Sequence, residues 1–279
     1  MMGFASSEAG KLFNLVPLSA DFLLTHLDQF MDRLVLLSAN VVLQAGKNDS
    51  LQIDHALVRH LHETIHPLFF HAFPGLEGVI QLNTDLHASL YLPVQHLIEL
   101  GHTRIGLVIG DTSDIWFRER LQGCLDALHE AGVGFVPNRI VIITTPEDET
   151  EYTELDRLLD PSSGITAIAC ATDQHALAVL ERCCKRGVRV PDDLAITGSD
   201  DIPEARLSLP PLTSVNGRDR DKGALAASLL ARELGGEILA PVIHTFKPHL
   251  VVRLSSDSAA CSTRSTHLKQ RVAKVAARA

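Results

Sequence analysis

Two adjacent carboxylates, Asp200 and Asp201, follow directly after the short apolar run of residues 194–197. In "LAITGSDDIPEARLSLPPLTSV" the apolar run predicts a buried strand, and the proline-rich stretch predicts a loop. Ligands of open α/β sheets bind beyond the carboxyl ends of the strands. We therefore expect one carboxylate to accept hydrogen bonds from a ligand and the other to cap the following segment. On these residues alone, the alternative that both only cap a helix stays open.

A histidine cluster, "HALVRHLHETIH", carries a second possible chemistry. His62 and His66 lie one helical turn apart, with His55, His60 and Glu63 nearby, which is a spacing of zinc ligands. Histidines on a solvated helix face are more common, and a catalytic zinc also needs a third ligand in a dry cavity. We therefore predict that the chain holds no metal and no other cofactor.

The signatures of common α/β enzymes are absent from the sequence. It contains no GxSxG elbow, no GxxxxGK[ST] phosphate loop and no GxGxxG turn. The adjacent aspartates resemble a metal or phosphotransfer pair, but no complementary lysine or second acid cluster lies in an obvious partner loop. We therefore predict a protein without catalytic activity.

Composition and charge narrow the class of protein. The 279 residues are 46% hydrophobic and 21% charged, which is typical of a soluble globular chain with room for two lobes. The net charge of −9 argues against binding of DNA by this chain alone, because such binding depends on clustered Lys and Arg. The five cysteines form no CxxC pair, and no basic segment precedes the first apolar stretch. We therefore expect a cytoplasmic protein with no membrane segment.

From about residue 85 onward the sequence repeats a helix-period segment, a glycine and a short apolar run. "LPVQHLIELG" precedes "RIGLVIG", and "RLQGCLDALHEAG" precedes "RIVIITT". Two further repeats end in "ITAIACAT" and "LAITGSDD". Nearly continuous apolar runs suit strands that are buried on both faces of a parallel sheet. We predict an α/β fold with a doubly wound parallel sheet in this region.

The residues before 85 carry a looser version of the same pattern. We expect strands at "KLFNLVPL", "NVVLQAG", "PLFFHAF" and "GVIQLN", and a helix across "FLLTHLDQFMDRLVLLS". Later in the chain, residues 217–235 predict a helix and "HLVVRL" predicts a strand. Residues 258–279 contain no acids and several basic residues, so residues 256–279 are expected to form a disordered basic tail.

The stretch "TDQHALAVLERCCKRGVRVPDDLAITGSDDIPEARLSLPPLTSV" resembles the effector-binding core of lactose-repressor/galactose-repressor (LacI/GalR) family regulators. "HLIELGHTRIGLVIG", "RERLQGCLDAL" and "AGV" fall in the family's order and spacing, so the resemblance covers residues 85–255. It implies a type I periplasmic-binding-protein-like fold with two doubly wound α/β lobes that three crossover strands join. A small ligand, such as a sugar or a nucleobase, closes the cleft between the lobes in this family.

On that resemblance, the N-terminal lobe takes residues 10–100 and 217–244, and the C-terminal lobe takes residues 103–215 and 246–255. The chain departs from the family in two places. The helix-turn-helix that reads DNA would precede "KLFNLVPL", where only a few residues stand. Between "NVVLQAG" and "PLFFHAF" one strand and one helix are missing, which predicts a shortened and less stable N-terminal lobe.

The resemblance also implies functional residues at matching positions. Arg120, in "RERLQG", takes the place of the arginine that holds ligand hydroxyls or carboxylates with its fixed fork of donors. Asp200 matches the acid that faces this arginine across the cleft. Asp173 and Thr172 stand in the family's "NDQ"-like motif, with Thr172 where asparagine is frequent. Asp85, in "LNTD", matches an acid near the hinge.

Two aromatic residues are further candidates for ligand binding. Trp116, the only tryptophan, lies in the loop after "RIGLVIG", where this family varies its specificity. Its indole could stack on a sugar or a base, and the alternative is that it covers the edge of the lobe. Phe22, in "LSADF", lies near the family's cleft aromatic but also suits a core position, and Ser19 is a weaker candidate.

The resemblance implies a non-catalytic, cytoplasmic sensor core of a transcription regulator, in which an effector shifts the equilibrium between open and closed lobes. Its partners would be a small-molecule effector and a second copy of the chain, with DNA bound only through a head that this chain lacks. A sugar-binding protein of a transport system shares the fold, and a truncated relative without a working cleft is a further alternative. The effector is expected to be a sugar or a nucleoside-like molecule, and the sequence does not distinguish among pentoses, hexoses, nucleosides and small acids.

Overall fold

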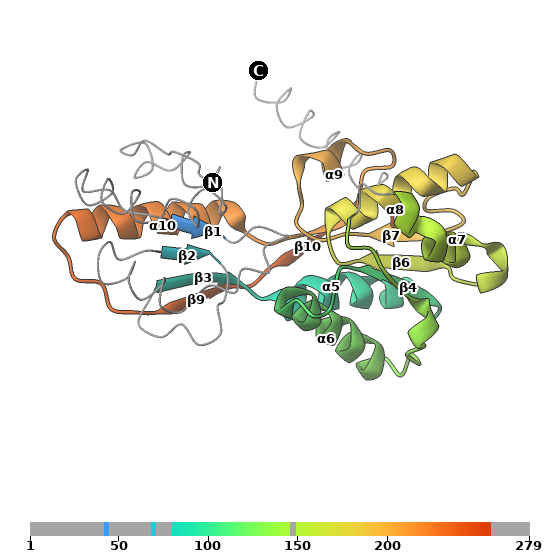
Figure 1. The fold of residues 1–279 in the computed structure, drawn as a ribbon, viewed down its shortest axis with the longest axis horizontal. Helices are drawn as coiled ribbons and strands as arrows, with labels where there is room; N and C mark the ends of the chain where they lie inside the picture. Colours follow the sequence, from blue (N-terminus) through green and yellow to red (C-terminus); the bar gives the residue numbers. More distant parts are fainter. Residues whose placement is uncertain (1–41, 45–67, 71–79, 146–148, 258–279) are drawn as a thin grey trace, which may run out of the picture. The chain divides into compact units, whose positions relative to one another are not determined.

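A computed structural model describes residues 42–44, 68–70, 80–145 and 149–257 of the chain (Figure 1). The chain divides into two compact units. Unit 1 comprises residues 1–84 and 218–247, and unit 2 comprises residues 85–217 and 248–279. The chain therefore passes from one unit to the other three times. Each unit contains a parallel β-sheet, which confirms the predicted α/β class.

Unit 2 is built on a four-stranded sheet with the strand order β5-β4-β6-β7. All of its strand pairs are parallel. Every residue of β4 and β6 is buried, as expected where helices cover both faces of a sheet. The strands are β4 (Ile105–Ile109), β5 (Ile140–Ile142), β6 (Ala167–Cys170) and β7 (Ala195–Thr197).

Helices cover both faces of this sheet (Figure 1). The helices α5 and α6 pack on one face, and α7 and α8 pack on the other. Their bounds are α5 (Leu86–Glu99), α6 (Ile115–Glu130), α7 (Thr153–Leu159) and α8 (Asp173–Arg186). Shorter helical segments lie in the loops: η2 (Pro137–Arg139), η3 (Glu149–Tyr152), η4 (Pro161–Ser163) and α9 (Pro203–Leu207).

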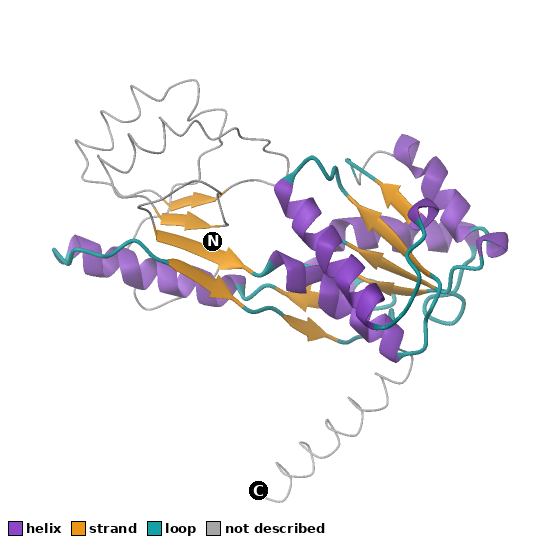
Figure 2. Cartoon of the chain, turned by 90° about the horizontal axis from the view of Figure 1, so that it is seen from below, coloured by secondary structure: helices purple, strands orange, loops and turns teal. Residues whose placement is uncertain are grey.

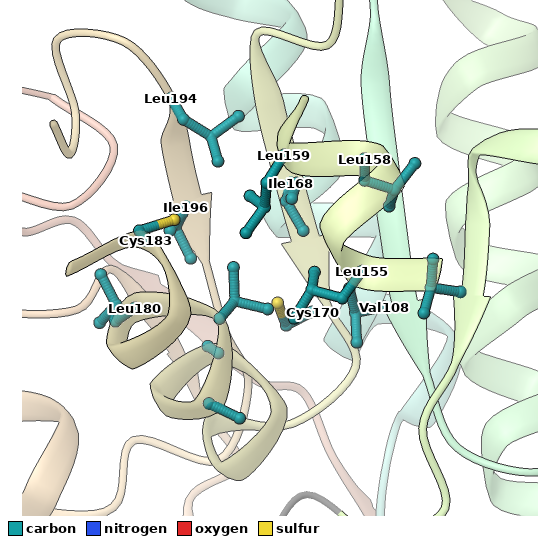
Figure 3. Packing of buried hydrophobic residues seen from close by; sticks show 14 of the residues in the cluster. Val108, Leu155, Leu158, Leu159, Ile168, Cys170, Leu180, Cys183, Leu194 and Ile196 are labelled. Carbon is teal, nitrogen blue, oxygen red and sulfur yellow. The ribbon is translucent and has the colours of Figure 1, made fainter. Parts of the chain in front are cut away.

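The side chains of each central strand alternate between the two faces. Ile168 and Cys170 of β6 pack with Val108 and with Leu155 of α7 (Figure 3). Ala167 and Ala169 of the same strand instead join the core beneath α5 and α6. Full burial of a side chain of leucine size contributes about 1.5–3 kcal/mol, so these two apolar layers are the main source of stability of unit 2. The doubly wound arrangement is therefore the one that the repeated pattern predicts.

The first helix of unit 2 differs from its prediction. Residues up to 100 were expected in the N-terminal lobe, but Leu90, Val94 and Leu97 of α5 pack into the core of unit 2. The helix lies so close to α6 that a Cβ atom at Gly123 of α6 would be only 2.0 Å from the carbonyl oxygen of His87. Only glycine permits this approach, so α5 belongs with the sheet of unit 2.

A two-stranded antiparallel ribbon completes unit 2. Its strands are β8 (Ser214–Asn216) and β10 (His249–Val251). The first strand directly precedes the passage of the chain into unit 1, and the second follows its return. The strand predicted from "HLVVRL" is therefore present, but β8 was not predicted.

Unit 1 contains a parallel sheet with the order β1-β2-β3-β9. The long helix α10 (Asp219–Leu234) runs along this sheet (Figure 2), and its small and apolar residues pack on Ile80 and Leu82. Three of the strands match predicted ones, whereas β9 was not predicted. The strands are β1 (Val42–Gln44), β2 (Leu68–Phe70), β3 (Ile80–Thr84) and β9 (Ile243–Phe246).

Several predictions fall outside the described residues. They are the strand and helix expected within residues 11–38, the histidine cluster of residues 55–66, the shortening of the N-terminal lobe, the absence of a DNA-binding head and residues 258–279 of the basic tail. The tail was predicted from residue 256, but Ser256 is 5% exposed and its Oγ is hydrogen-bonded to Oγ1 of Thr213 over 2.7 Å, so this residue belongs to the folded part. In the part of the chain that the structure describes, no helix has the length and apolar composition needed to cross a bilayer. Within those same ranges, no group of three or more His, Cys, Asp and Glu side chains is arranged to hold a metal ion.

Candidate functional site

The loops and helices that follow β4, β6 and β7 carry most of the predicted site residues. Because these strands are parallel, their carboxyl ends share one edge of the unit 2 sheet. Arg120 lies in the second turn of α6, which follows β4, and Asp173 is the first residue of α8, which follows β6. Asp200 and Asp201 come after β7, in a segment that we call the Asp200 turn (residues 198–202).

Arg120 and Asp200, the predicted binding pair, are in contact. Nη2 of Arg120 donates a hydrogen bond to Oδ1 of Asp200 over 3.1 Å. The two side chains are 12% and 20% exposed, so the pair is largely shielded from water. Nε of Arg120 is buried and has no acceptor among the described residues. A buried donor without an acceptor is costly, so this N–H favours an oxygen atom supplied by a ligand.

A strained backbone holds the two carboxylates apart. Asp200 and Asp201 have φ angles of 118° and 49°, in a region that side chains other than glycine rarely adopt. Such a residue costs on the order of 1–3 kcal/mol and persists only where its surroundings fix it. Here the amide of Asp200 donates to the carbonyl of Val215 over 2.9 Å, and the amide of Asp201 donates to Oγ of Ser214 over 3.0 Å. The turn therefore depends on β8.

Asp201 points into the protein. Its side chain is 3% exposed, and its carboxylate accepts hydrogen bonds from Arg253, from Arg206 over 2.8 Å and from Asn216 over 2.8 Å. Burial by itself raises the pKa of this carboxyl, but these hydrogen bonds outweigh burial and hold the pKa below its ordinary value. The expectation that the second aspartate caps the next helix is wrong, because Ile202 is the cap of α9 and no side chain caps this helix.

Asp173 also lies inside the protein. Its side chain is fully buried, and its two oxygens accept hydrogen bonds from Oγ of Ser214 over 2.6 Å and from the amide of Ile202 over 2.9 Å. Burial raises the pKa of Asp173 to about 6, and the nearby charges of Asp200 and Asp201 act in the same direction. The structure therefore gives Asp173 the role of holding the Asp200 turn from behind, in place of the predicted contact with a ligand.

Two small residues support this arrangement, one as a helix cap and one by leaving space for Asp173. Thr172 is the N-cap of α8, since its Oγ1 accepts a hydrogen bond from the amide of His175 over 3.2 Å. Thr172 is 3% exposed, so its hydroxyl supports the start of α8 from inside the protein. At Gly198 a Cβ would lie 2.3 Å from Oδ1 of Asp173, so only glycine allows the strand end to approach the buried carboxylate.

Trp116 lies in the first turn of α6 and not in the loop where it was predicted. The carboxylate of Asp114 caps this helix and accepts a hydrogen bond from the amide of Trp116 over 2.8 Å. Phe117 meets the ring of His175 edge-on at 5.9 Å, which anchors the start of α6 to α8. Residues four apart share a helix face, so the partly buried indole is on the same face as Arg120.

The remaining candidates lie elsewhere. Asp85 is the N-cap of α5, where its Oδ1 accepts a hydrogen bond from the amide of Ala88 over 2.9 Å. Phe22 and Ser19 are outside the described residues. The sequence did not predict Arg253, although an arginine within the apolar run "HLVVRL" is itself a signal, because a buried charge needs a partner.

Comparison with known proteins agrees with this geometry. The sequence profile of the family described as "Periplasmic binding protein-like domain" matches residues 94–256. The chain is 31% identical over 169 residues to the HTH-type transcriptional repressor PurR of Pasteurella multocida, covering 60% of this chain and 50% of that protein. It is 36% identical over 166 residues to the HTH-type transcriptional regulator DegA of Bacillus subtilis, covering 60% of this chain and 49% of that protein. The alignments thus span about half the length of these relatives.

A solved structure shares both the fold and part of the sequence. The complex of the transcriptional regulator CelR with cellobiose superposes with a TM-score of 0.67 at 28% identity, over 82% of this chain and 69% of that chain. The matched region of the family profile is more than half of the 279 residues and contains Arg120 and the Asp200 turn. The chain belongs to the family of periplasmic binding protein-like domains, and its relatives include transcription regulators.

Proposed function

We propose that this chain is a non-catalytic effector-binding core of a LacI-type transcription regulator, and that it binds a sugar or a nucleobase-like molecule at Arg120 and Asp200. The observation that carries the proposal is the contact between these two side chains at the carboxyl edge of the unit 2 sheet. The buried Nε of Arg120, which has no acceptor in the described part of the chain, supplies a further donor for a ligand oxygen.

The chemistry of the pair favours a neutral polar ligand. A hydroxyl group both donates and accepts, so it can bridge the carboxylate of Asp200 and the guanidinium of Arg120. The N–H and carbonyl edge of a nucleobase offers the same combination. Cellobiose is the ligand in the CelR complex, which supports a sugar. The neighbouring Asp173 is fully buried and both of its oxygens accept internal hydrogen bonds, so this carboxylate is not placed to act as a base on a ligand.

The relatives favour a regulator over a transport protein with the same fold. Both PurR and DegA are named as HTH-type transcription regulators, and each is more than 30% identical to this chain over the matched region. We therefore place the chain in the cytoplasm, with a small-molecule effector and a second copy of itself as partners. Contact with DNA would be made through a helix-turn-helix segment of the kind those names indicate.

A thermal-shift screen tests the proposal. The probes are D-ribose, cellobiose, glucose 6-phosphate, guanosine and guanine, and binding to the native state raises the melting temperature with dose. The fluorescence of Trp116, the only tryptophan, supplies a second signal from the same helix face as Arg120. We expect at least one probe to change both signals.

Matched variants make the screen specific. Arg120→Ala and Asp200→Asn should abolish the response, whereas Arg118→Ala, at an exposed position of the same helix, and Asp192→Asn, whose side chain is 61% exposed, should retain it. A response that survives in Arg120→Ala and Asp200→Asn would place the binding site elsewhere. A cooperative melt that no probe shifts would contradict a sugar or nucleobase effector.

A further inference from the structure

We infer that Asp201 is a positioning residue that couples the Asp200 turn to the two strands next to the chain's passages between units. The inference rests on the proposed function, because it concerns the regulation of the same site. The side chain of Asp201 is 3% exposed and is hydrogen-bonded to Arg206, Asn216 and Arg253, so its effect on a ligand would act through Asp200.

Two partners of Asp201 come from β8 and from the segment just after β10. Nδ2 of Asn216, the last residue of β8, donates to Oδ2 of Asp201 over 2.8 Å. Arg253, two residues after the end of β10, donates to Oδ1. Unit 2 ends at residue 217, directly after β8, and resumes at residue 248, directly before β10. One carboxylate therefore binds the segment that leaves unit 2 and the segment that returns to it.

The backbone strengthens the same connection. The amide of Asp200 donates to the carbonyl of Val215 in the middle of β8, and the amide of Asp201 donates to Oγ of Ser214. A displacement of β8 would therefore move both carboxylates of the turn. By linkage, a ligand that favours one position of Asp200 also favours one position of the ribbon.

Arg253 is held too firmly to be an incidental partner. It is 5% exposed, its Nη1 donates to the carbonyl of Leu212 over 2.6 Å, and its amide donates to Oγ1 of Thr213 over 2.8 Å. Buried ion pairs add little net stability, because desolvation offsets their attraction, but they require one geometry. The pair of Arg253 and Asp201 thus specifies the position of the positive-φ turn relative to the ribbon.

Hydrogen exchange of the ligand-free chain tests the coupling directly. The amides of Asp200, Asp201 and Ile202 are all hydrogen-bonded in the structure. In Arg253→Met we expect these three amides to exchange about 10-fold faster or more, since a hydrogen bond to a charged group is lost. The amides of β4 and β6 should keep their rates, which separates an effect on the turn from a general loss of stability.

Ligand affinity supplies the second measurement. The probes are D-ribose, cellobiose and guanine, followed by the fluorescence of Trp116. For each probe that binds the unmodified chain, Asp201→Asn and Arg253→Met should raise Kd by about 10-fold or more, and the double variant should be no worse than either single one. Arg206→Met is the matched control, because Arg206 also binds Asp201 but is 56% exposed and lies on α9, outside the ribbon. It should change Kd far less.

The outcomes are distinct. Unchanged exchange at residues 200–202 and unchanged Kd in Arg253→Met would overturn the inference, and so would an equal effect of Arg206→Met. If no probe binds the unmodified chain, the proposed function fails for these ligands, while the exchange rates still decide whether the ribbon holds the turn. If Arg253→Met does not fold, Arg253→Lys, which keeps the charge but not the fork, should show a smaller change in the same three amides.

Discussion

Three carboxylates meet at the Asp200 turn, and each has a different environment. Asp200 contacts Arg120 and keeps some exposure, and the buried Asp201 is a charged carboxylate paired with Arg253 and Arg206. Asp173 is buried without a cationic partner among its hydrogen bonds. Of the three side chains, only that of Asp200 is partly exposed, at 20%. The other two fix the backbone whose strain presents it.

Replacement of Arg120 by lysine separates charge from geometry. Arg120→Lys keeps the positive charge but loses the planar fork and the buried Nε donor. We expect effector affinity to fall about 10-fold or more, because at least one hydrogen bond to a charged group is lost. Calorimetric titration with a probe that binds the unmodified chain measures the change. Equal affinity in Arg120→Lys would show that only the charge matters.

Asp173 predicts a pH dependence of stability. Its folded pKa of about 6 lies above the ordinary value of 3.8, so between these values the folded state holds a proton that the unfolded state releases. The contribution of Asp173 to the free energy of unfolding is therefore largest below about pH 4 and is lost as the pH rises through 6. The free energy of unfolding changes on the order of 3 kcal/mol over this range. Asp173→Asn resembles the protonated form and should remove this loss.

Urea unfolding at several pH values checks the prediction. The free energy of unfolding of Asp173→Asn, relative to the unmodified chain, should increase as the pH rises from 4 to 7. Asp192→Asn, at an exposed position, serves as the control. A difference between the variant and the unmodified chain that does not vary with pH would contradict the raised pKa.

At the scale of elements, α5 packs closely on the middle of α6, the helix that carries Arg120. Gly123→Ala would gain about 1 kcal/mol in an isolated helix, but here its Cβ would lie 2.0 Å from the carbonyl oxygen of His87. We expect the contact to prevail and the free energy of unfolding to fall by about 1–3 kcal/mol. Gly134→Ala, where a Cβ meets nothing within 4 Å, is the control in denaturant unfolding. A more stable Gly123→Ala variant would show that the helices separate easily.

At the scale of the whole molecule, the two units have separate cores. Both core clusters of unit 2 include residues of β4 and β6, while the core of unit 1 in the described ranges is a single layer between α10 and β3. We expect the slowest hydrogen exchange in residues 105–109 and 167–170, and faster exchange in residues 80–84. An effector that binds beside Arg120 should slow exchange in unit 2 first. Mass spectrometry of the corresponding peptides measures these exchange rates. Slower exchange in residues 80–84 than in residues 105–109 and 167–170 would contradict the expected order.

The sequence by itself determined the four-stranded sheet of unit 2 and the helices α5 to α8, because hydrophobic periodicity and glycine stops are local signals, and continuous apolar runs mark strands buried on both faces. Its resemblance to a known family also selected Arg120 and Asp200, which the fold brings into contact. Only the tertiary structure decided which carboxylates lie inside. Asp201 and its partner Arg253 are 52 positions apart in the sequence. Asp173 accepts hydrogen bonds from Ser214 and Ile202, which belong to other segments. Likewise, α5 joins unit 2 because of its packing against α6, which local sequence does not record. Burial and partner choice depend on such long-range contacts, so a strand-end aspartate looks the same in sequence whether it faces a ligand or the core.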